Sequence, residues 1–106
     1  MYFLPLAREI RRAVRMPLVL LGGITSLEHL QTARNEGFEL MAMARALIHD
    51  PGLIARYAAG SARQSGCIPC NRCVAEMDRE GGVRCARVPE QLAERAAAVR
   101  AARPES

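Results

Sequence analysis

The sequence lacks tryptophan and lysine, and it has only two tyrosines and two phenylalanines among its 106 residues. All 15 basic residues are therefore arginines, and they are scattered along the chain. Proteins that bind single-stranded nucleic acid combine a basic groove with several aromatic side chains on which bases stack. This composition therefore disfavours a nucleic-acid partner.

Long apolar runs are also absent. The chain has no stretch of about 18 apolar residues, which is the length that a membrane-spanning helix needs. Arg8 interrupts the N-terminal apolar stretch before it reaches the length of a signal-peptide core. We therefore expect no membrane partner and a cytoplasmic location. The length is sufficient for one small hydrophobic core.

The spacing of apolar residues predicts alternating helices and strands. The predicted elements are helix 3–14, strand 17–21, helix 25–37, strand 40–44, a helical turn at 45–48 and helix 50–60. The continuous apolar run 17–21 is typical of a parallel strand that is buried on both faces. Thr25 and Glu28 form a capping-box pattern at the start of one helix, and Asp50-Pro51 predicts the start of another. This alternation with short loops predicts parallel strands crossed by helices.

Two short segments follow the predicted strands and could bind an anion. Gly22 and Gly23 follow the first strand, and Ala44 and Arg45 follow the second. Backbone N–H groups without an obstructing side chain, and those at the start of a helical turn, bind phosphate readily. The alternatives are that the glycine pair is only a tight turn and that Arg45 is a surface residue.

The four cysteines form one cluster in the sequence. Cys67, Cys70, Cys73 and Cys85 all lie within 19 residues, in a chain without an export signal, so metal ligation is favoured over disulfides. Four thiolates are the number and type of ligand that a [4Fe–4S] cluster or a structural zinc ion needs. Residues 61–88 have few large apolar side chains, so a metal would supply the energy that orders them. Unligated thiols remain a third possibility.

Three segments, in this order, resemble the C-terminal end of the old yellow enzyme and 2,4-dienoyl-CoA reductase family of NAD(P)H-dependent flavin oxidoreductases. They are PLVLLGGI at 17–24, LMAMARALIHDP at 40–51 and CIPCNRC at 67–73. The resemblance implies that the two predicted strands are the seventh and eighth strands of a (β/α)8 barrel. It also implies an FMN phosphate held by Gly22 and Gly23 on one side and by Ala44 and Arg45 on the other.

The same resemblance implies the cofactors and the reaction. NAD(P)H reduces FMN, and the flavin passes hydride to an activated alkene or a similar small-molecule acceptor. Dienoyl-CoA-reductase-like members carry an iron–sulfur cluster at the place of the cysteines. This chain departs from the family pattern at Ala44, where glycine is common, and at Ala46, where proline is common. It also has two residues, not three, between Cys70 and Cys73.

These observations lead to one expectation for the architecture. We expect an α/β chain that is the C-terminal part of a TIM barrel, with about two βα units, followed by a cysteine-rich loop and a C-terminal helix. The expected divisions are residues 1–60, the metal-binding loop 61–88 and the Ala/Arg-rich helix or tail 89–106. Such a fragment would need the missing barrel portion or self-association, and it would contain no catalytic residue. The alternative is a free-standing zinc-binding interaction module.

Overall fold

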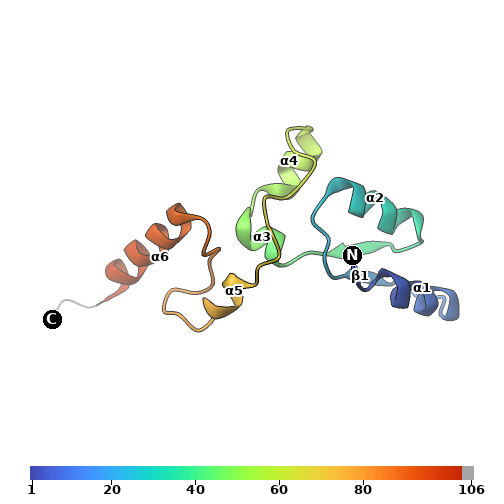
Figure 1. Cartoon of the computed structure of the whole chain (residues 1–106), viewed down its shortest axis with the longest axis horizontal. Helices are drawn as coiled ribbons and strands as arrows, with labels where there is room; N and C mark the ends of the chain where they lie inside the picture. Colours follow the sequence, from blue (N-terminus) through green and yellow to red (C-terminus); the bar gives the residue numbers. More distant parts are fainter. Residues whose placement is uncertain (104–106) are drawn as a thin grey trace. The chain divides into compact units, whose positions relative to one another are not determined.

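The computed structural model describes residues 1–103 and divides the chain into two compact units, the first from Met1 to Cys67 and the second from Ile68 onward. Figure 1 shows the elements in sequence colours. The first unit contains α1 (Leu4–Ala13), β1 (Val19–Leu21), α2 (Leu27–Asn35), β2 (Leu40–Ala42), α3 (Arg45–His49) and α4 (Leu53–Ala59), and the second contains α5 (Arg72–Ala75) and α6 (Pro89–Ala102). The last three residues of the predicted segment 89–106 lie outside the described residues.

A short parallel sheet organises the first unit. β1 and β2 pair in parallel, with Val19 opposite Leu40 and Leu21 opposite Ala42, and α2 connects the two strands. Leu20 of β1 points into a core to which α1 and α2 both contribute. The buried members of this core are Leu4, Leu20, Ile24, Ala33 and Phe38. Both helices therefore cover the same face of the sheet.

The other face of the sheet is open in the described chain. Val19, Leu21 and Leu40 are each more than half exposed, at 55%, 54% and 61% of their surface. Because successive side chains of a strand point to opposite faces, these three residues form one apolar surface. In the described chain, the apolar run at 17–21 is therefore buried on one face and open on the other.

The predicted fold class is also wrong. Residues 1–103 form six helices and one sheet of two strands, each three residues long, and this arrangement is no portion of a TIM barrel with two βα units. After β2 the backbone leaves the extended region at Ala44 and enters α3, then α4, without a further strand in the described residues. Few ladder hydrogen bonds can form between strands this short, so packing of helices on one face supplies most of the order.

The structure corrects the predicted starts of two helices. The N-cap of α2 is Ser26, whose Oγ accepts a hydrogen bond from the His29 N–H at 3.1 Å, and not Thr25. α4 begins after Gly52, two residues later than the Asp50-Pro51 pattern predicted. The Asp50 Oδ1 accepts a hydrogen bond from the Gly52 N–H at 3.0 Å, so its carboxylate orders the turn before the helix.

A second core lies under α3 and α4. Its buried members are Ala46, Leu53 and Tyr57. The Tyr57 hydroxyl donates a hydrogen bond to the Thr25 carbonyl oxygen at 3.1 Å, which connects α4 to the segment before α2. Burial, and to a lesser extent the charge of Asp50, raises the pKa of the Tyr57 hydroxyl. Tyr57 thus combines an apolar ring in the core with a satisfied polar group.

The first part of the predicted metal-binding loop, residues 61–66, is held by backbone hydrogen bonds. The Leu27 N–H donates to the Arg63 carbonyl oxygen at 2.8 Å, and the Ser65 N–H donates to the Thr25 carbonyl oxygen at 2.7 Å. Ser26 and Gln64 form an isolated antiparallel bridge between them. The segment therefore closes back on the start of α2.

The second unit has little hydrophobic burial. None of the residues from Ile68 to Arg103 is fully buried, and α6 packs only partly buried side chains such as Leu92 and Val99. α5 is a single helical turn in the segment where the sequence predicted no helix. No helix within residues 1–103 combines the length and the apolar character needed to cross a membrane.

Candidate functional site

The two predicted phosphate-binding segments lie at the same edge of the sheet. Gly22 and Gly23 follow β1, and Ala44 and Arg45 follow β2. Because β1 and β2 are parallel neighbours, both pairs lie at the carboxyl ends of their strands. This is the edge at which open α/β sheets bind their ligands.

The glycine turn requires glycine at both positions. Gly22 has a φ of +112° and Gly23 a φ of +68°, which side chains rarely tolerate. A Cβ atom at Gly22 would lie 2.4 Å from Cδ2 of Phe3, and one at Gly23 would lie 2.9 Å from Cδ1 of Tyr2. Two aromatic rings therefore lie directly against the turn.

Tyr2 connects the turn to Arg45. The Arg45 Nη2 donates a hydrogen bond to the Tyr2 hydroxyl at 2.8 Å, while the Tyr2 ring contacts Gly23. The rings of Tyr2 and Phe3 meet edge to face, with their centroids 4.6 Å apart. Arg45 and the glycine turn are thus brought together around one aromatic side chain. Sequence reasoning missed Tyr2, because its signal, an aromatic residue just before an amphipathic helix, carries no information about a contact 43 residues away.

The backbone of Ala44 also lies at this edge of the sheet. It is exposed and precedes α3, and its carbonyl oxygen accepts hydrogen bonds from the N–H groups of Leu47 and Ile48, both at 3.0 Å. Apart from the ladder between β1 and β2, the N–H groups of Gly22 and Gly23 donate no hydrogen bond to another group within residues 1–103. The edge therefore offers two N–H donors and one guanidinium group, which together suit an oxyanion.

The cysteines are distributed over both units. Cys67 is the last residue of the first unit, and Cys70, Cys73 and Cys85 belong to the second. All four carry thiols; Cys70 is exposed and the other three are partly buried. The Cys67 N–H donates to Ser65 Oγ at 3.0 Å, and the Cys85 N–H donates to Gln91 Oε1 at 2.9 Å.

The metal site stays a prediction. Within residues 1–103, no three or more His, Cys, Asp or Glu side chains are gathered in an arrangement that could hold a metal ion. Binding by all four thiolates would therefore require the cysteine segment to close around the metal. Such closure is usual where the metal supplies the folding energy of a short segment.

One comparison with known proteins gives a relative. The chain is 52% identical, over 73 residues, to a 4,4'-dithiodibutanoate disulfide reductase of Rhodococcus erythropolis. The matched part covers 69% of this chain and 18% of that relative, so the chain corresponds to less than a fifth of the relative's length. No family model and no solved structure matches the chain. The chain is therefore similar to part of an oxidoreductase.

Proposed function

We propose that this chain is part of a flavin-dependent NAD(P)H oxidoreductase and that it binds the phosphate of FMN. The observation that carries the proposal is the meeting of the glycine turn and Arg45 at one edge of the sheet, around Tyr2. The relative supports the redox class, since its name is that of a disulfide reductase. The resemblance to the old yellow enzyme family supports the choice of FMN.

The residues at the edge have the right chemistry for a phosphate group. Gly22 and Gly23 have no side chains of their own to cover their N–H groups, and Ala44 adds its backbone at the start of α3. Arg45 adds positive charge and can donate two parallel hydrogen bonds to phosphate oxygens. Bound FMN would accept hydride from NAD(P)H and pass two electrons to a small-molecule acceptor. The part of the chain described here holds and orients the phosphate end.

Flavin titration tests this site. We expect the chain to bind FMN, measured by quenching of flavin fluorescence, and we expect Arg45→Gln to weaken binding by roughly 1.5–3 kcal/mol, the range for a hydrogen bond to a charged group. Arg34→Gln on α2 is a matched control, because it removes the same charge from an exposed position that contacts none of the site residues. Failure of the wild-type chain to bind FMN, or equal affinities for all three proteins, would contradict the proposal.

We further propose that Cys67, Cys70, Cys73 and Cys85 hold one [4Fe–4S] cluster. The support is that no residue from Ile68 to Arg103 is fully buried, so hydrophobic burial cannot by itself order this segment. A bound cluster would supply that order, and it would add a carrier of single electrons to the enzyme.

Metal analysis of protein purified without oxygen tests the cluster. We expect iron and sulfide in the wild-type protein, loss of both in Cys73→Ser, and retention of both in Val74→Ser. Val74 is the matched control because it is the next residue of α5 and is 54% exposed. Zinc without iron would instead support the alternative of a zinc-binding interaction module, and the absence of both metals would leave the cysteines as thiols.

A further inference from the structure

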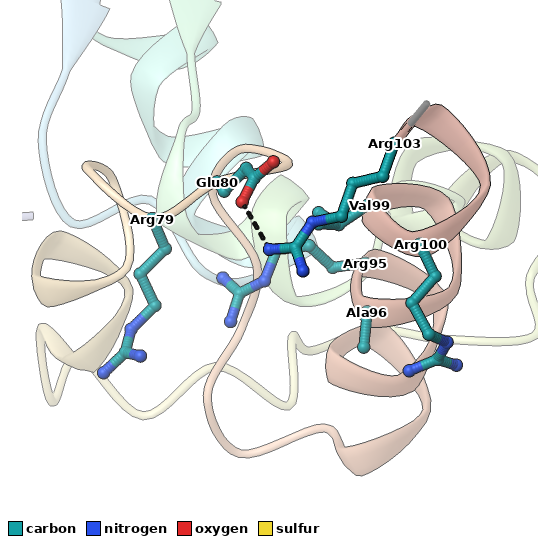
Figure 2. Close-up of a pocket in the computed structure, with 7 residues that line it drawn as sticks. All are labelled: Arg79, Glu80, Arg95, Ala96, Val99, Arg100 and Arg103. Atoms are coloured by element: carbon teal, nitrogen blue, oxygen red, sulfur yellow. Dashed lines mark hydrogen bonds and ion pairs between the residues drawn. The ribbon is translucent and has the colours of Figure 1, made fainter. Parts of the chain in front are cut away.

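A basic groove lies in the second unit, between the turn that contains Gly81 and one side of α6. Figure 2 shows the side chains that line this basic groove. They are Arg79, Glu80, Arg95, Ala96, Val99, Arg100 and Arg103. The volume of the groove is about 390 Å³, which lies in the range of about 300–1,000 Å³ of small-molecule sites.

The sequence builds the groove with helical spacing and one glycine. Arg95, Val99 and Arg103 are four residues apart, so they lie along one side of α6. Gly81 lies against this side: a Cβ atom there would be 2.7 Å from Cγ of Arg95 and 2.8 Å from Cγ2 of Val99, and its φ is +89°. Only glycine therefore allows the turn to approach α6 this closely, and the approach brings Glu80 to Arg103.

Two carboxylates partly neutralise the groove. The Glu76 Oε2 lies 2.8 Å from Arg95 Nη1 and 3.1 Å from Arg79 Nε, and the Glu80 Oε2 lies 3.1 Å from Arg103 Nη2. The groove is lined by four arginines, three of which form ion pairs with these two carboxylates, so an excess of two positive charges remains. The side chain of Arg100 forms no ion pair or hydrogen bond with any other group of residues 1–103.

Glu76 holds two of the arginines in place. Its Oε2 is buried, and although both guanidinium groups lie within ion-pair distance, neither N–H points at it closely enough for a hydrogen bond. Arg95 is itself 12% exposed, and its hydrogen bond goes from Nη1 to the Gly82 carbonyl oxygen at 3.3 Å. The Nε–H and Nη2 hydrogens of Arg95 therefore have no acceptor among the described residues, since a guanidinium has five donors.

We infer that the basic groove binds a small molecule that carries a dianionic oxyanion group, a phosphate ester or a dicarboxylate, through Arg95, Arg100 and Arg103. The excess of two positive charges matches such a ligand, and planar guanidinium groups bind phosphate and carboxylate oxygens in pairs. This site lies wholly within the second unit and is independent of the phosphate site proposed at Arg45.

The test is binding of inorganic phosphate, pyrophosphate and succinate to the full chain at low ionic strength, by equilibrium dialysis. We expect two sites per chain for phosphate, one weakened at least about tenfold in Arg45→Gln and the other weakened at least about tenfold in Arg100→Gln, the effect expected for one charge-assisted hydrogen bond. Arg34→Gln should keep both sites.

The outcomes separate the two sites and the two ligand classes. Retention of one phosphate site in Arg45→Gln, lost in the double variant with Arg100→Gln, supports the basic groove whatever happens at the FMN site. Binding of succinate that depends on Arg100 supports a dicarboxylate as the ligand, and binding of pyrophosphate alone supports a phosphate ester. If Arg100→Gln and Arg103→Gln both bind all three probes as the wild type does, the inference is overturned.

Discussion

Leu53 and Ile54 are neighbours on α4, but one side chain is buried and the other is exposed. The pair therefore tests which face of α4 is buried in the first unit. Leu53 is 2% exposed and packs with Ala46 and Tyr57 in the second core, whereas Ile54 is 48% exposed. Both side chains have four carbon atoms beyond the Cα atom, so replacement by alanine removes the same number of atoms from each. We therefore expect Leu53→Ala to be much more destabilising than Ile54→Ala.

The magnitudes follow from burial. Removal of a buried leucine side chain costs about 2–5 kcal/mol, depending on how far the neighbours can move into the cavity. The second core is small, and its neighbours Leu47 and Met43 are only partly buried, so we expect about 2–3 kcal/mol for Leu53→Ala. For Ile54, about half of the side chain already contacts water, and we expect about 1 kcal/mol or less.

Urea denaturation followed by far-UV circular dichroism, at one fixed protein concentration, measures the two differences. Small domains are stabilised by about 5–15 kcal/mol in total, so a loss of about 2–3 kcal/mol moves the midpoint substantially. A loss for Ile54→Ala equal to that for Leu53→Ala would refute the assignment of the buried face of α4. Hydrogen exchange of the α4 amides would then identify the face that is protected in solution.

Three further predictions concern acid, one hydrogen bond and association. The Arg8 hydrogen bond lowers the pKa of Glu36, and the Leu18 N–H lowers the pKa of Glu39. Both carboxylates therefore stabilise the fold above their unfolded-state pKa, and this stability is lost as the pH falls through the lowered pKa values. Glu39→Gln should flatten the acid limb of a denaturation profile, whereas Glu28→Gln should not. Tyr57→Phe removes one of the two hydrogen bonds that the Thr25 carbonyl oxygen accepts, the other coming from the Ser65 N–H, and should cost about 1 kcal/mol in the same urea assay. The open sheet face should make the chain associate with itself, so its sedimentation coefficient should depend on protein concentration. Leu40→Lys should reduce this association more than Ile54→Lys does. A wild-type monomer at all concentrations would contradict this prediction.

Local signals in the sequence predicted several elements well. The periodicity of 3–14 predicted α1, and the predicted end of helix 50–60 coincides with Gly60, which ends α4 with a φ of +75°. These features depend on residues within one or two turns of each other, which is the range over which helix periodicity and capping act. The placement of Gly22-Gly23 and of Ala44-Arg45 after two parallel strands follows from the same local patterns.

Features that depend on distant residues were not predicted. The apolar run at 17–21 does not reveal that Leu20 is buried while Val19 and Leu21 are more than half exposed. The resemblance to a barrel enzyme led to a fold class that the structure contradicts. The contact of Tyr2 with Arg45 spans 43 residues. The basic groove was not predicted for the same reason, because nothing in the residues around Arg79 and Glu80 indicates that Gly81 brings this turn against α6.

The backbone hydrogen bonds between Arg63 and Leu27 and between Ser65 and Thr25 have a consequence for how this chain can vary in length. Connecting loops usually accept insertions and deletions, because their backbone groups bond to water. Here one added or removed residue at 61–66 would shift the Ser65 N–H away from the Thr25 carbonyl oxygen and would leave the start of α2 without its partner at Arg63. We therefore expect homologous chains to keep a constant number of residues between Gly60 and Cys67.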